Sequence, residues 1–198
     1  MSIPLPGPHV PRRESRALRL FGAGVLRALG WRVEGELPDL SRFVVIVAPH
    51  SSNWDFVVGA AAMFALDLRL SFLGKDVLFR GPLGPLMRAM GGIPVDRASS
   101  HGVVASALEA FHARDRLVLA IAPEGTRKAV ERLKSGFLHI ARGAGVPILL
   151  ATIDGTTRSI RLGPLLEPTA DAPGDLARIE RHYRDVRGWR AKRFPHHA

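Results

Sequence analysis

Short apolar runs that alternate with helical patterns constrain the fold of this chain more than any other feature. Three of the runs cover Phe43–Ala48, Leu117–Ile121 and Pro147–Ile153. They are rich in β-branched residues and show no polar alternation, which is the pattern of strands buried on both faces. Helical patterns over Gly102–Ala113 and Ser135–Ala144 lie between them. This alternation predicts an α/β fold with a mixed, mostly parallel central sheet flanked by helices.

The rest of the chain continues this pattern without a linker that would divide it. We expect further strands over Leu70–Leu73, Ile93–Val95 and Ser159–Leu166, the last at an edge of the sheet, and a terminal helix over Asp175–Trp189. A length of 198 residues with 46% apolar content suits one domain. We therefore predict a single domain over residues 13–198. A flexible arm with four prolines, residues 1–12, precedes it.

A basic amphipathic helix is expected at the start of the domain, over about residues 13–29. Leu18, Val25, Leu26 and Leu29 form its apolar stripe, and arginines border it. Such a helix can lie in a lipid interface, or it can pack on the domain core with its arginines in water. No run reaches the roughly 18 apolar residues of a spanning helix, and the start of the chain does not resemble a signal peptide. We therefore expect a cytoplasmic protein, soluble or bound peripherally to the cytoplasmic face of a membrane.

The formal charge of +10 limits the classes of partner. Arginines at both ends of the chain attract nucleic acid, anionic lipid, acidic carrier proteins or phosphorylated cofactors. No zinc-ligand spacing and no aromatic-rich RNA motif is present, so nucleic acid is not an expected partner. The absence of cysteine excludes disulfides, thiolate metal sites and a cysteine nucleophile.

His50 and Asp55 form a candidate catalytic pair directly after the first apolar run. Four residues separate them, and the first three, Ser-Ser-Asn, favour a turn and a helix N-terminus. If His50 lies on the turn and Asp55 starts the helix, the carboxylate can bind one imidazole nitrogen and leave the other as a base. The alternative is that Asp55 caps the helix and His50 is an ordinary loop histidine.

A second polar cluster, Glu124-Gly125-Thr126-Arg127, follows the run that ends at Ile121. Gly125 permits close approach of the backbone to a ligand, and Thr126 and Arg127 are suited to phosphate oxygens. A buried Glu124 would need a partner, such as an arginine or a substrate hydroxyl. Two further cations, Lys75 and Arg97, follow other predicted strands; the alternative for Arg97 is a surface ion pair with Asp96.

The order of these motifs resembles the glycerolipid acyltransferase family typified by lysophosphatidic acid acyltransferases. The motifs are His50 to Asp55, Gly-Gly-Ile-Pro-Val-Asp-Arg at residues 91–97, Pro-Glu-Gly-Thr-Arg at 123–127 and Gly-Val-Pro-Ile at 145–148. Lys-Ser-Gly-Phe at 134–137 also resembles the segment that follows the third motif in the family. The resemblance is strongest over residues 43–153.

The resemblance implies a reaction and a set of roles. His50 would deprotonate an acceptor hydroxyl and Asp55 would orient it. Lys75, Arg97, Glu124, Gly125, Thr126 and Arg127 would bind the acceptor, a lysophospholipid similar to 1-acylglycerol 3-phosphate. The acyl donor would be acyl-CoA or acyl-carrier protein, with no metal or other cofactor. Two alternatives are a thioester or ester hydrolase that uses the same histidine, and a non-catalytic protein that binds anionic lipid. A serine esterase is disfavoured because no Gly-x-Ser-x-Gly motif occurs.

Overall fold

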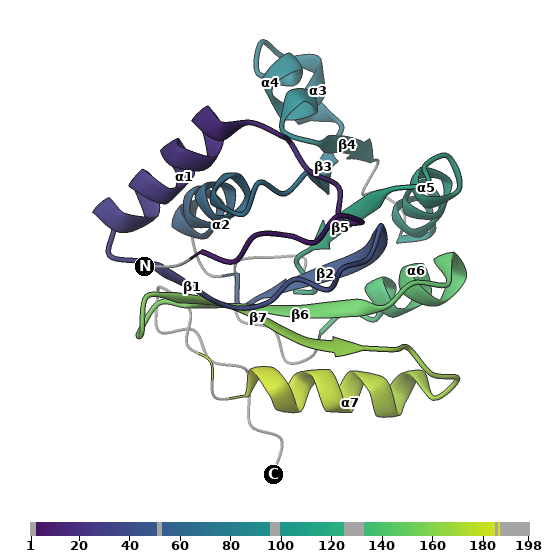
Figure 1. The fold of residues 1–198 in the computed structure, drawn as a ribbon. Coiled ribbons are helices and arrows are strands. Elements are labelled where there is room, and N and C mark those ends of the chain that lie inside the picture. The colour runs from purple at the N-terminus through teal and green to yellow at the C-terminus, as the bar shows by residue number, and fades with distance from the viewer. Residues whose placement is uncertain (1–2, 51–52, 96–99, 125–132, 185, 187–198) are drawn as a thin grey trace.

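The fold is a three-layer α/β arrangement around one central sheet (Figure 1). A computed structural model describes residues 3–50, 53–95, 100–124, 133–184 and 186. Within these residues the sheet has seven strands in the order β1-β7-β6-β2-β5-β3-β4. Their bounds are β1 Arg32–Gly35, β2 Arg42–Ala48, β3 Leu70–Lys75, β4 Gly92–Val95, β5 Leu117–Ile121, β6 Ile148–Asp154 and β7 Ser159–Leu166.

The sheet is mixed and mostly parallel, as predicted. Five neighbouring strands, β6, β2, β5, β3 and β4, are parallel to one another. β7 runs antiparallel to β6, and β1 runs parallel to β7. The prediction that residues 159–166 form an edge strand is wrong, because β1 pairs with the outer side of β7. β1 was not predicted, since its sequence Arg-Val-Glu-Gly is short and polar.

Helices cover both faces of the sheet. Their bounds are α1 Arg16–Ala28, α2 Asn53–Ala65, α3 Val77–Arg80, α4 Gly84–Ala89, α5 Ser100–His112, α6 Gly136–Ala144 and α7 Ala172–Tyr183. One core contains Val44 and Ile46 of β2 together with residues of α5, α6 and α7. The other contains Phe43 and Val45 of the same strand together with residues of α1 and α2. Alternate residues of β2 therefore serve opposite layers, as expected for a strand with period-two side chains.

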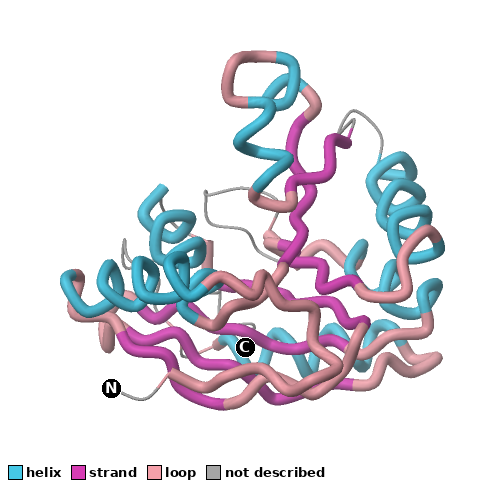
Figure 2. Tube along the Cα trace, turned by 45° about the horizontal axis from the view of Figure 1, so that its top comes forward, coloured by secondary structure: helices cyan, strands magenta, loops and turns pink. Residues whose placement is uncertain are grey.

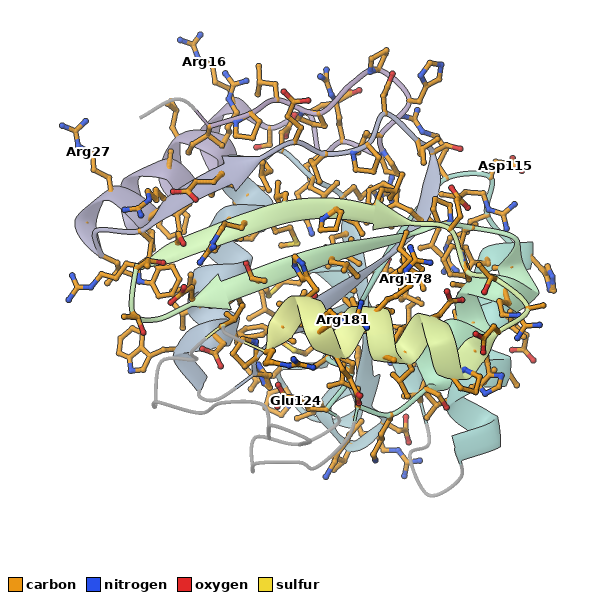
Figure 3. All side chains as sticks on the ribbon, turned by 90° about the horizontal axis from the view of Figure 1, so that it is seen from below. Arg16, Arg27, Asp115, Glu124, Arg178 and Arg181 are labelled. Carbon is orange, nitrogen blue, oxygen red and sulfur yellow. The ribbon has the colours of Figure 1, made fainter. Side chains whose placement is uncertain are left out.

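α1 packs on α2 through its inner face and leaves apolar residues on its outer face. The Ser15 side chain caps it by accepting a hydrogen bond from the Leu18 N–H at 3.3 Å. Gly22 and Leu26 are buried, which agrees with packing on the core. Leu20 and Phe21 are 61% and 60% exposed. Arg16 and Arg27 point away from the domain (Figure 3).

The described part of the predicted N-terminal arm, residues 3–12, lies against the domain and contains a turn in which the Val10 N–H donates to the Gly7 carbonyl. Val10 is completely buried. The Arg116 guanidinium donates to the carbonyl oxygens of Pro8, His9 and Val10 at 3.2, 3.0 and 2.9 Å. These bonds hold the arm next to the start of β5.

α3 and α4 form a helical hairpin that projects beyond the sheet (Figures 1 and 2). The hairpin connects β3 to β4, and Phe79 is its buried anchor. A Cβ atom at Gly74 or Gly92 would lie 2.7 or 2.8 Å from the Phe79 ring. Both glycines are therefore required for the ring to lie directly on the two strands.

None of the helices within the described ranges combines the length and the apolar character needed to cross a bilayer.

Candidate active site

Four neighbouring parallel strands direct their carboxyl ends to one edge of the sheet. β5 lies between β2 and β3, and β4 is the outermost strand on that side. The register pairs Ile46 of β2 with Ile121 of β5, and Lys75 of β3 with Val95 of β4. The segments that follow these strands therefore emerge at the same edge, where open α/β sheets bind their ligands.

His50 and Asp55 lie together at this edge. His50 follows β2, and Asp55 is in the first turn of α2. His50 Nδ1 lies 3.5 Å from Asp55 Oδ2. This distance is longer than a well-formed hydrogen bond, although such contacts in catalytic sites commonly shorten when substrate binds. The carboxylate is buried, whereas a quarter of the His50 side chain is exposed.

The geometry distinguishes the two imidazole nitrogens. Because Nδ1 faces the buried Asp55 carboxylate, Nε2 is the nitrogen at the far side of the ring from that carboxylate. An Asp55 carboxylate that accepts a hydrogen bond from Nδ1–H favours the tautomer in which Nε2 carries a lone pair. The pair can therefore act as a general base through Nε2, with Asp55 stabilising the protonated ring.

Glu124 connects the second polar cluster to the first. Its side chain is completely buried, and its Oε1 accepts a hydrogen bond from the His50 main-chain N–H at 2.9 Å. A buried carboxylate needs such hydrogen bonds to offset its desolvation. The sequence led us to expect an arginine or a substrate hydroxyl as partner, and the main chain of the candidate base was not anticipated.

The remaining predicted site residues are placed only in part. Lys75 is the last residue of β3 and is exposed at the same edge. Arg97, Gly125, Thr126 and Arg127 lie outside the described residues. The chain on either side of residues 125–132 is brought together, since the Lys134 N–H donates to the Pro123 carbonyl at 2.9 Å.

The described residues contain no group of three or more His, Cys, Asp or Glu side chains that could hold a metal ion. His50, Asp55 and Glu124 are groups capable of acid–base chemistry: one carboxylate lies next to the imidazole, and the other holds the main chain of the same residue.

Comparison with known proteins identifies the family of this site. Residues 31–153 match the family model described as Acyltransferase, which is more than half of the chain. The chain belongs to the acyltransferase family. The matched segment contains every predicted site residue, from His50 to Arg127.

Curated relatives in the acyltransferase family carry one name. The proteins named 1-acyl-sn-glycerol-3-phosphate acyltransferase from Salmonella typhimurium, Salmonella typhi and Escherichia coli are each 28% identical to this chain over 167 residues. The similarity covers 80% of this chain and 66% of each relative. The chain thus spans less than two thirds of the length of these relatives.

A solved structure in the acyltransferase family shows the same fold. It is the 1-acyl-sn-glycerophosphate acyltransferase from Thermotoga maritima, with a TM-score of 0.60 and 19% sequence identity. The similarity covers 83% of this chain and 74% of that protein.

Proposed function

We propose that this protein transfers a fatty acyl group from a thioester donor to the hydroxyl of a lysophospholipid similar to 1-acylglycerol 3-phosphate. The observation that carries the proposal is the contact between His50 Nδ1 and the buried Asp55 carboxylate, with the Glu124 carboxylate bonded to the His50 main chain. Family membership and the names of the curated relatives support the choice of substrate class.

The chemistry begins with proton removal by His50. Nε2 takes the proton of the acceptor hydroxyl as its oxygen attacks the thioester carbonyl carbon. The new C–O bond forms, the C–S bond breaks, and the protonated ring returns the proton to the leaving thiolate. Asp55 stabilises the positive charge that the ring carries between the two transfers. The chain needs no covalent acyl-enzyme for this sequence, because the acceptor oxygen is itself the nucleophile.

We assign the acceptor phosphate to three cations. Lys75 is the last residue of β3, and Arg97 and Arg127 come after β4 and β5 in the sequence. Arginine provides bidentate contacts to phosphate oxygens. Gly125 permits close approach of the main chain, and Thr126 adds a hydroxyl. Glu124 contributes by holding the His50 main chain. A carboxylate would repel a phosphate placed directly against it.

The donor is acyl-CoA or acyl-carrier protein, and no metal or redox cofactor takes part. Both donors carry negative charge, which the net charge of +10 attracts. Peripheral binding to the cytoplasmic face of a membrane would bring the site to an acceptor dissolved in the bilayer. Each cationic side chain near an anionic surface contributes about 1 kcal/mol to such binding.

A direct test incubates the purified chain with acyl-CoA or acyl-carrier protein and a panel of lysophospholipids, with products identified by mass spectrometry. We expect a diacyl phospholipid to form in proportion to enzyme, with 1-acylglycerol 3-phosphate among the accepted substrates. Donor breakdown that ignores added lysophospholipid would identify a hydrolase. No reaction with any donor, together with binding to anionic vesicles, would identify a lipid-binding protein.

A further inference from the structure

The helical hairpin of α3 and α4 exposes apolar side chains on a rigid base. Val77, Leu78, Leu83 and Leu86 are 68%, 49%, 60% and 54% exposed. We call these four residues the hairpin surface. Phe79 holds the hairpin on β3 and β4, and the Arg88 guanidinium donates to the Phe79 carbonyl at 3.1 Å. Because the base is packed, the exposure of the four residues does not result from a loose loop, and exposed apolar clusters mark interaction sites.

The hairpin surface lies at the active-site edge of the sheet. The hairpin begins directly after Lys75, at the carboxyl end of β3. A second group of exposed apolar side chains lies at the start of α2. They are Trp54, Phe56 and Val57, which are 50%, 46% and 40% exposed. The Phe56 ring contacts the Phe72 ring of β3 with centroids 6.3 Å apart. Both apolar segments therefore border the strand ends that carry His50 and Lys75.

The charges near the hairpin surface suit an anionic partner. Lys75, Arg80 and Arg88 are exposed cations, opposed in this segment only by Asp76, which pairs with Arg80. Exposed leucines and valines next to arginines and a lysine are the composition of segments that enter the interface of an anionic bilayer.

A second protein is a poorer fit than a bilayer. Stable protein interfaces use roughly 20–30 residues on each side, whereas α3 and α4 comprise 4 and 6 residues. A hairpin of this size projecting from the domain (Figure 2) can enter a lipid surface without a complementary protein groove.

We propose that the hairpin surface docks the protein on anionic phospholipid bilayers, with the active-site edge facing the lipid. The proposal rests on the proposed function, because it explains how a lysophospholipid in a bilayer reaches His50. It assigns membrane contact to an element other than the basic N-terminal helix. The leucines and Val77 insert among the lipid tails, while Lys75, Arg80 and Arg88 contact the phosphates of the lipid head groups.

The first test measures flotation of the full chain with vesicles of phosphatidylcholine containing phosphatidylglycerol. Leu83→Ser combined with Leu86→Ser removes apolar surface without changing charge. We expect partitioning to fall roughly tenfold or more. Leu5→Ser combined with Leu40→Ser is the matched control. Leu40 is an exposed leucine before β2, at the opposite end of that strand from His50, and Leu5 lies in the arm. The control should float like the unsubstituted protein.

A second measurement does not depend on loss of binding. The chain has no cysteine, so Leu83→Cys and Leu40→Cys each give one labelling site for an environment-sensitive fluorophore. Vesicles should shift the emission of the label at position 83 to the blue and leave the label at position 40 unchanged. A blue shift at both positions, or at neither, would contradict docking through the hairpin.

Activity assays separate this proposal from the proposed function. The Leu83→Ser, Leu86→Ser protein should acylate detergent-dispersed lysophospholipid normally and vesicle-embedded lysophospholipid slowly. Normal flotation of this variant overturns the docking proposal, whatever its activity. Hairpin-dependent flotation without acyl transfer under any condition leaves docking intact and overturns the proposed function. A dimer in solution that the same variant dissociates would identify a second copy of the chain as the partner instead of lipid.

Discussion

The main-chain N–H of His50 donates a hydrogen bond to Oε1 of Glu124, 2.9 Å away and 74 residues later in the chain. The bond joins the segment after β2 to the segment after β5. These strands are parallel neighbours, so both segments leave the sheet at the same edge. The bond to the buried carboxylate then holds the main chain of the candidate base in position. We therefore propose that Glu124, which the family resemblance places with the acceptor, is a positioning residue that acts on the reaction through His50.

Replacement of Glu124 tests this role. Glu124→Ala removes the acceptor and should lower kcat about 10²-fold, since small displacements of a catalytic group have effects of this size. Glu124→Gln keeps a carbonyl oxygen at the same place and should retain most of the activity. Steady-state kinetics with both substrates provides the measurement. If Glu124→Gln is as impaired as Glu124→Ala, the negative charge is required and the positioning role is insufficient.

His50 and Asp55 are expected to be needed for the chemical step. His50→Ala removes the base and should reduce kcat about 10²–10⁴-fold. Asp55→Asn keeps the shape of the buried side chain but replaces the carboxylate with a neutral amide that does not stabilise the protonated imidazole, so a loss on the order of 10² or more is expected. Circular dichroism confirms that each variant is folded. A folded His50→Ala protein with near-normal transfer would exclude the mechanism.

Arg127 is expected to act on the acceptor and to have little effect on the donor. Arg127→Ala should raise the acceptor KM about 10–100-fold, the range for loss of one charge-assisted hydrogen-bond pair. The donor KM serves as the internal control. The variant should also discriminate less between 1-acylglycerol 3-phosphate and a monoacylglycerol that lacks phosphate. A larger change in the donor KM would place Arg127 at the donor.

Strands with an apolar run can be predicted from the sequence. A short strand with polar residues, which depends on its partner strand to form, cannot. Residues 117–121 and 159–166 are strands over the predicted ranges. β1 escapes prediction because Arg32 and Glu34 interrupt any apolar pattern, and its formation depends on β7. Because β1 was not predicted, the prediction placed β7 at an edge of the sheet. Local patterns carry no information about a partner strand more than a hundred residues away.

In the candidate site, too, contacts between residues close in sequence are predictable, and contacts set by strand pairing are not. The spacing of His50 and Asp55 predicts their contact, because the two residues are close in sequence and Asp55 lies in the first turn of α2. The bond from His50 to Glu124 is fixed by the pairing of β2 with β5, and no local signal reports it. The hairpin surface was likewise missed, since Val77 and Leu78 could equally belong to a buried helix.

Tyr183 is expected to make the folded state less stable at alkaline pH. Its hydroxyl donates to the carbonyl oxygens of Ile46 and Ala151 at 3.0 and 3.1 Å, and burial raises its pKa well above 10.0. Above about pH 10 the unfolded phenol ionises while the folded one keeps its proton. The unfolded state then binds fewer protons, so stability falls as pH rises beyond the unfolded pKa.

The measurement is direct because Tyr183 is the only tyrosine in the chain. Tyrosinate absorbance should appear together with alkaline unfolding, and not at pH 10 in the folded protein. Tyr183→Phe should cost about 1 kcal/mol of stability at neutral pH and remove this part of the alkaline loss. Tyrosinate that forms while the far-ultraviolet dichroism remains native would contradict the buried environment.

Two glycines of α1 should respond in opposite directions to alanine. A Cβ atom at Gly22 would lie 2.4 Å from the Ala61 carbonyl of α2, whereas a Cβ atom at Gly24 meets nothing within 4 Å. Gly22→Ala should therefore destabilise the fold by about 1–3 kcal/mol through overpacking, and Gly24→Ala should stabilise it by about 0.5–1 kcal/mol through helix propensity. Urea unfolding of both variants provides the comparison. Stabilisation by both substitutions would show that α1 does not pack closely on α2 at Gly22.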